Sequence, residues 1–182
     1  MFTTPFAKIS KRNEKKLTFS VFYLLLITSV AMLYFDTYVT NTTTPNGIVS
    51  FELAKSLERS QEILDSWSPL AKIFAGIGLG FDFLFLLIYT LFISIIIHKI
   101  NVRLWAEKPF YRVGEILIWT MFLTAVFDAI ENVCLIKLLI GNLKQYWSTV
   151  AFYLSTAKFS FISISLLYIV SNFVFLLVKK RS

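Results

Sequence analysis

Four long apolar stretches dominate the chain, at residues 17–39, 70–97, 113–140 and 149–178. Each stretch meets the requirement for a transmembrane helix, which is about 20 consecutive and mostly apolar residues. Polar and charged residues are concentrated between the stretches rather than within them. The pattern therefore predicts an all-α fold, an integral membrane four-helix bundle that forms a single domain over residues 1–182.

A different pattern occupies residues 45–67, between the first two apolar stretches. Apolar and small residues recur there at spacings of three and four, with charged residues on either side, which is typical of an amphipathic helix. Thr44-Pro45 favours a helix start before this segment, and Ser68-Pro69 favours another start after it. We expect one additional external amphipathic helix, which either lies on the membrane surface or caps the bundle.

The charge distribution predicts how the chain is oriented. Charged residues make up only 16% of the chain and hydrophobic residues 57%, whereas a soluble domain has about 25% charged residues. The net charge of +7 comes from basic residues at the ends of the apolar stretches, which suits lipid headgroups rather than a nucleic acid. Twelve basic residues, including Lys179, Lys180 and Arg181, lie next to the ends of the apolar stretches that would face one side of the membrane. Three lie next to the ends that would face the other side. We therefore expect a protein of the bacterial inner membrane, with both termini on the cytoplasmic side and membrane lipids as partners.

Ionisable residues lie in the middle of three apolar stretches: Asp82 in the second, Asp128 and Glu131 in the third, and Lys158 in the fourth. At that depth each costs about 2.5–3.5 kcal/mol unless it is paired or hydrated. The helical rise places Asp82, Asp128 and Lys158 in one layer, about 15–18 Å below the outer surface, and Glu131 one turn nearer that surface. Asp128, Glu131 and Asn132 share a helix face that we expect to point into the bundle. Because the carboxylates outnumber the ammonium, a bound proton or cation is expected to supply the balance.

Two further residues complete the candidate site. Gly78 lies one turn before Asp82, where its missing side chain either opens a small cavity toward that carboxylate or serves helix packing. Glu52 is either solvated or, if the amphipathic helix folds over the bundle, reaches the mouth of this cavity. The candidate ligand- or ion-binding residues are therefore Asp82, Asp128, Glu131, Asn132, Lys158, Gly78 and Glu52.

The residue types limit the chemistry of the cluster. Carboxylate and amide oxygens suit Na⁺, Ca²⁺ or Mg²⁺ better than zinc, and His98, the one histidine, is far along the second stretch. Ser155 and Lys158 are three residues apart, but a nucleophile also needs a base and oxyanion donors, so no catalytic residue is expected. The alternative interpretation of the cluster is a polar core that only fixes helix packing.

Four segments carry a resemblance to known proteins: TPNGIVSFELAKSLERSQEILDSW, GFDFLFLLIYT, FDAIENVCLIKLL and STAKFSF. They resemble a group of small four-span membrane proteins found in bacteria, and the resemblance implies one common pattern for Glu52, Asp82, Asp128, Glu131, Asn132 and Lys158. More faintly, Asp36 near the end of the first stretch and Asp82 inside the second resemble acids of the emopamil-binding-protein superfamily, which implies ligand binding. The chain departs from that superfamily in its Asp128-x-x-Glu131-Asn132 pattern and in lacking its catalytic histidine.

These observations predict a membrane protein, rather than an enzyme, whose buried Asp/Glu/Lys cluster lines an outward-opening cavity. The ligand expected there is a small amphiphile, a lipid or a cation. The alternative prediction is an ion- or proton-coupled transporter or channel. The sequence is compatible with a homo-oligomer but does not fix the oligomeric state. The third predicted function is a lipid-modifying membrane enzyme.

Overall fold

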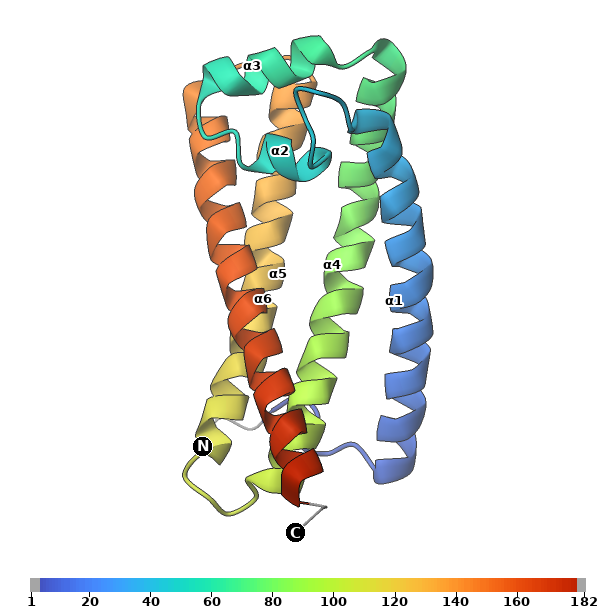
Figure 1. The fold of residues 1–182 in the computed structure, drawn as a ribbon, viewed down its shortest axis with the longest axis vertical. Helices are drawn as coiled ribbons and strands as arrows, with labels where there is room; N and C mark the ends of the chain where they lie inside the picture. Colours follow the sequence, from blue (N-terminus) through green and yellow to red (C-terminus); the bar gives the residue numbers. More distant parts are fainter. Residues whose placement is uncertain (1–3, 180–182) are drawn as a thin grey trace.

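The computed structural model describes residues 4–179, and its main feature is a bundle of long helices with no β-strand in that range. The helices are α1 (Lys11–Val39), α2 (Ile48–Glu52), α3 (Leu57–Ser66), α4 (Pro69–Leu104), α5 (Tyr111–Leu139) and α6 (Gln145–Lys179). The long helices lie side by side, with α2 and α3 at one end (Figure 1). We call this the capped end and the opposite end, where residues 4 and 179 lie, the terminal end. The all-α class predicted from the sequence is confirmed.

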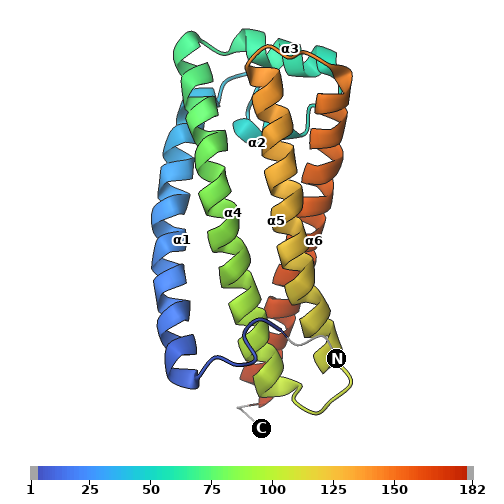
Figure 2. The same ribbon diagram turned by 180° about the vertical axis from the view of Figure 1, so that it is seen from behind.

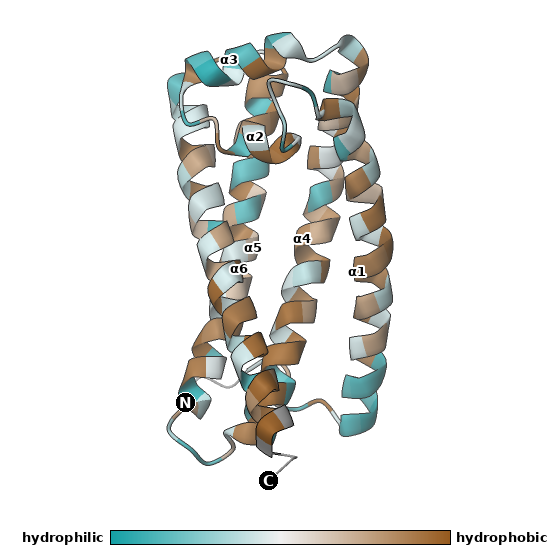
Figure 3. Cartoon of the chain, viewed as in Figure 1, coloured by the Kyte–Doolittle hydropathy of each residue, from teal (hydrophilic) through white to brown (hydrophobic). Residues whose placement is uncertain are grey.

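Within the described residues, four helices are long and apolar enough to cross a membrane, namely α1, α4, α5 and α6. Apolar residues cover most of their length, whereas polar residues gather on α3 and at the terminal end (Figure 3). Two of the basic residues that entered the orientation argument, Lys180 and Arg181, lie outside the described residues.

Helix α4 is longer than the predicted stretch because its last turns pack against the rest of the bundle. It continues from residue 97 to Leu104, and Asn101 in this extension is fully buried. The Asn101 amide donates a hydrogen bond of 2.8 Å to the carbonyl of Tyr111, at the start of α5. Trp105, at the C-cap of α4, donates from Nε1 to the Asn172 side chain of α6 at 2.7 Å. These bonds fasten α4 to α5 and α6 at the terminal end.

The prediction of a single amphipathic helix at residues 45–67 is wrong in one respect, because the segment forms two helices. Between α2 and α3, Lys55 adopts a left-handed conformation with φ 63°, and the Ser56 side chain accepts a hydrogen bond from the backbone of Arg59 to begin α3. Helix α2 turns into the bundle and buries Phe51 and Glu52, whereas α3 lies across the capped end (Figure 1). One straight helix cannot do both, and the apolar spacing continues across the break, which hides it in the sequence.

The turn that leads into α2 depends on a contact with α1. The Asp36 carboxylate, near the end of α1, accepts a hydrogen bond of 2.8 Å from the backbone N–H of Ile48. Gly47 precedes it with φ 54°, and any side chain there would collide with that carboxylate. Asp36 therefore has a structural partner in this fold, since it holds the first turn of α2.

Helix α4 is at the centre of the packing. It packs along α1 on one side and along α5 on the other, and α6 packs along α5 (Figure 2). The buried apolar residues form two clusters, one toward the capped end around Phe51 and Leu135 and one toward the terminal end around Ile95 and Met121. Between these two clusters lies a layer of polar residues, which we call the polar layer. Its members are Glu52, Asp82, Tyr89, Asp128, Glu131, Asn132 and Lys158.

The close approach of α4 and α5 at the terminal end can be tested with two glycines. A methyl group added at Gly114 would come within 2.5 Å of the Asn101 side chain, which hydrogen bonds to Tyr111 and Tyr168 hold in place. We expect Gly114→Ala to lower the free energy of unfolding by about 1–3 kcal/mol, because the added methyl group would overpack the contact with Asn101. The measurement is unfolding by dodecyl sulfate titration in mixed micelles.

The matched control is Gly80→Ala in α4, where an added methyl group meets nothing within 4 Å. This variant should be neutral or more stable by up to about 1 kcal/mol, because alanine is the better helix former. Equal losses of stability in the two variants would contradict the close approach at Gly114.

Candidate functional site

The centre of the polar layer is the ammonium group of Lys158 in α6. Its Nζ lies 2.9 Å from Asp128 Oδ1, 3.0 Å from Glu131 Oε2 and 3.3 Å from Glu52 Oε2. All four side chains are buried, and the exposed fraction of Glu131 is 0%. An ammonium has three N–H donors, so the three carboxylates account for all of them. We call these four residues the Lys158 centre.

Three elements bring the Lys158 centre together. Asp128 and Glu131 are one turn apart on the buried face of α5, as their spacing predicts. Lys158 lies on the buried face of α6 at the same level. Glu52 is the last residue of α2, and the inward turn of this short helix carries it to Lys158. Of the two alternatives for Glu52, solvation or insertion, the structure shows insertion.

Two hydrogen bonds extend the layer toward α4. Tyr89 donates from its hydroxyl to Asp128 Oδ2 at 2.7 Å. Asn132 donates from Nδ2 to Asp82 Oδ2 at 2.6 Å. Tyr89 is not among the site residues predicted from the sequence, although it follows Asp82 by seven residues on α4, which is two helical turns on the same face. That spacing is the signal that could have found it.

The Lys158 ammonium takes the position that a bound cation would need among the three carboxylates. Within residues 4–179, no group of three or more His, Cys, Asp or Glu side chains is arranged to hold a metal ion. A metal at this point would have to displace the ammonium that already pairs with Asp128, Glu131 and Glu52. The centre is thus a buried ion-pair network built from the chain itself.

Asp82 differs from the other carboxylates of the layer. In the described part of the chain it forms no ion pair, and its hydrogen-bond partner is the neutral amide of Asn132. Its side chain is only partly buried. With Asp82 the layer holds four carboxylates against one ammonium, so its negative charge exceeds its positive charge unless protons or another cation are present.

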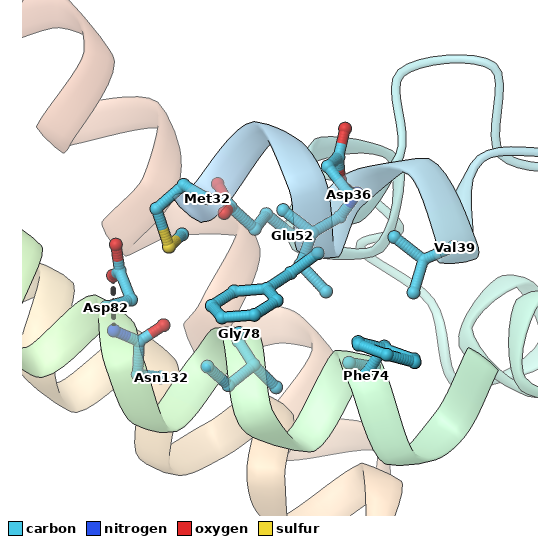
Figure 4. Close-up of a pocket in the computed structure, with 12 residues that line it drawn as sticks. Met32, Asp36, Val39, Glu52, Phe74, Gly78, Asp82 and Asn132 are labelled. Carbon is cyan, nitrogen blue, oxygen red and sulfur yellow. Dashed lines mark hydrogen bonds between the residues drawn. The ribbon is translucent and has the colours of Figure 1, made fainter. Parts of the chain in front are cut away.

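A pocket lies beside Asp82, between α1, α2 and α4 (Figure 4). Asp82 and Asn132 form one part of its wall, Asp36 and Glu52 contribute two more carboxylates, and Gly78 leaves room between them. The pocket has about 340 Å³ between its atoms, mouth included, of which about 20 Å³ admits the centre of a water molecule. This is room for about one water, so the cavity expected near Gly78 is present but narrow.

The other residues weighed from the sequence lie apart from this pocket or have local partners. The Ser155 hydroxyl donates to the carbonyl of Ala151 at 2.7 Å, rather than to Lys158. His98 is buried near the terminal end, where its Nδ1 lies 3.3 Å from the Thr4 hydroxyl and its ring packs near Phe6.

Removing the central ammonium should be costly. We expect Lys158→Met to lower the free energy of unfolding by about 3–5 kcal/mol, because it leaves buried carboxylates without their partner. Adding Asp128→Asn and Glu131→Gln to this variant should recover part of the loss, because the unpaired charges are then removed as well. The measurement is equilibrium unfolding in mixed micelles.

Lys137→Met is the matched control, since Lys137 is a partly buried lysine in the last turn of α5. Its loss should cost less than about 1 kcal/mol, which is the usual contribution of a cation at a helix C-terminus. If Lys158→Met behaves like this control, the ion pairs contribute little to stability.

No protein-family model, no curated protein and no solved structure matches this chain. Residues 4–179 establish an all-α fold with four helices suited to a membrane and a buried Lys–Glu–Asp network between them.

Proposed function

We propose that this protein binds a small organic cation at Asp82, with the ammonium group of an amine or amphiphile in the pocket between α1, α2 and α4. The observation that carries the proposal is the difference between Asp82 and the carboxylates of the Lys158 centre. Asp82 borders the pocket and has an amide rather than a cation as its partner. A carboxylate at membrane depth is strongly stabilised by a positive charge placed against it.

The walls of the pocket suit an alkylammonium group. Phe35 and Phe74 present aromatic rings and Met32 a flexible thioether, and such side chains favour cations that carry methyl or methylene groups. Asp36 also lines the pocket, and its carboxylate accepts a backbone hydrogen bond but forms no ion pair within residues 4–179, so it adds negative charge to the surroundings. A strongly hydrated metal ion would bind less well in this pocket, because the apolar walls cannot replace its water ligands.

A ligand larger than water needs the pocket to widen. Helix α1 packs chiefly on α4, and little of its apolar stretch is buried, so α1 is the least constrained of the four long helices. A small outward displacement of α1 would open the space beside Met32 and Phe35. The alkyl part of an amphiphile would then extend between α1 and α4 toward lipid.

The orientation that the basic residues favour determines which side of the membrane the pocket faces. With both termini in the cytoplasm of a bacterial inner membrane, the capped end faces outward. The pocket would then take its cation from the outer leaflet or from the space beyond it. Lys158 would not compete for Asp82, because its donors are already committed to three other carboxylates.

The proposal can be tested with hexyltrimethylammonium and the protein purified in a neutral maltoside detergent. At about 100 times its Kd the ligand should stabilise the fold by about 2.7 kcal/mol, which raises Tm by about 5–10 °C for a chain of this size. Asp82→Asn should abolish this shift, because it removes the charge that the ammonium contacts. Hexanoate, with the opposite charge and a similar tail, should give no shift.

Asp65→Asn is the matched control, since Asp65 is an exposed carboxylate on α3. This variant should keep the full shift with hexyltrimethylammonium. A shift of equal size in Asp82→Asn, or with hexanoate, would show that detergent-like binding elsewhere explains the effect.

A further inference from the structure

A second pocket lies at the terminal end, beside the loop that joins α4 to α5 (Figure 1). It has about 1280 Å³ between its atoms, mouth included. Pockets that hold small molecules have volumes of about 300–1,000 Å³, so this one has room for a polar headgroup. The pocket beside Asp82 lies toward the capped end, so binding at either pocket does not depend on the other.

Four charged residues line the terminal-end pocket, two of each sign: Glu107, Lys108, Arg112 and Glu115. None of them forms an ion pair within residues 4–179. This holds even for Arg112 and Glu115, which are one turn apart on α5 and could pair across that turn. Both signs of charge are therefore available at one pocket to a ligand that carries both.

The loop beside the pocket has a defined shape. Glu107 adopts a left-handed conformation with φ 65°, which glycine would adopt at lower cost, so the fold bears a cost to keep a carboxylate at this position. The ammonium of Lys108 lies 5.4 Å from the centre of the Trp105 ring, and Trp105 is itself bonded to Asn172 of α6. These contacts keep one charge of each sign beside the pocket.

The pocket lies at the level of the lipid headgroups. Arg112 is the last residue before the apolar stretch 113–140, and basic residues at such a boundary face the headgroups. Exposed apolar side chains follow Arg112 on the same face of α5, at Ile116, Trp119 and Leu123. An acyl chain that lies along this face would place its headgroup at the pocket.

We propose that the terminal-end pocket binds the headgroup of a zwitterionic phospholipid that carries a primary ammonium. Lys108 and Arg112 bind the phosphate, and a guanidinium can do so with two parallel N–H donors. Glu107 and Glu115 bind the ammonium, which has three N–H donors. An anionic phospholipid without an ammonium would place its phosphate near two carboxylates that it cannot neutralise, so the pocket disfavours it.

The test uses the full chain in a neutral maltoside detergent, titrated with dioleoyl phosphatidylethanolamine or dioleoyl phosphatidylglycerol. Native mass spectrometry gives an apparent Kd for each lipid. The wild-type protein should bind phosphatidylethanolamine more tightly than phosphatidylglycerol, which lacks the ammonium.

Two double variants separate the roles of the charges. Glu107→Gln with Glu115→Gln should weaken the binding of phosphatidylethanolamine about tenfold, which is the loss of two solvent-exposed ion pairs. The same variant should not weaken the binding of phosphatidylglycerol. Lys108→Gln with Arg112→Gln should weaken the binding of both lipids, because both carry the phosphate. The replaced side chains are exposed apart from Glu115, which is partly buried, so these variants should fold.

Lys11→Gln with Glu58→Gln is the matched control, since these are exposed charges on α1 and α3, outside the pocket. It should leave both apparent Kd values unchanged. The proposal is overturned if the wild-type protein binds phosphatidylglycerol as tightly as phosphatidylethanolamine, a comparison that needs no variant. It is also overturned if the loss of Glu107 and Glu115 leaves the affinity for phosphatidylethanolamine unchanged, or weakens it no more than the control does.

Discussion

The fold depends on burying one ammonium group at membrane depth. Lys158 would be prohibitively costly there alone, as would each carboxylate around it. In the folded chain its Nζ lies within 3.3 Å of oxygens of Asp128, Glu131 and Glu52, which offsets the cost of burying the charge. This requirement fixes the level of α6 relative to α5, and it draws α2 into the space between the helices. The two apolar clusters form on either side of this layer.

The short helix α2 is the element that this requirement explains best. By itself a helix of five residues has little stability, and its inward direction is set by its contacts at both ends. At its start, the Asp36 carboxylate holds the backbone of Ile48, and Gly47 allows the turn. At its end, Glu52 reaches Lys158. An acid of α1 and a lysine of α6 are thus linked through α2.

The division of roles among the carboxylates gives the site its asymmetry. Those of the Lys158 centre pair with its ammonium, whereas Asp82 lies at the edge of the layer with Asn132 and the pocket. The polar groups of α4 and α6 continue from the centre toward the terminal end. One buried charged layer thus contains three carboxylates paired with an ammonium and a fourth that borders the pocket.

The sequence by itself determined the four long helices and the layer of ionisable residues, because hydrophobic length and helical rise are local properties. The shared face of Asp128, Glu131 and Asn132 followed from helical periodicity in the same way. Only the tertiary structure decided which carboxylates pair with Lys158 and that Asp82 does not, since this depends on the relative rotation and level of the packed helices. It also decided the break between α2 and α3. The apolar spacing continues across that break, and the break is favoured only once Glu52 and Phe51 have a buried place to occupy.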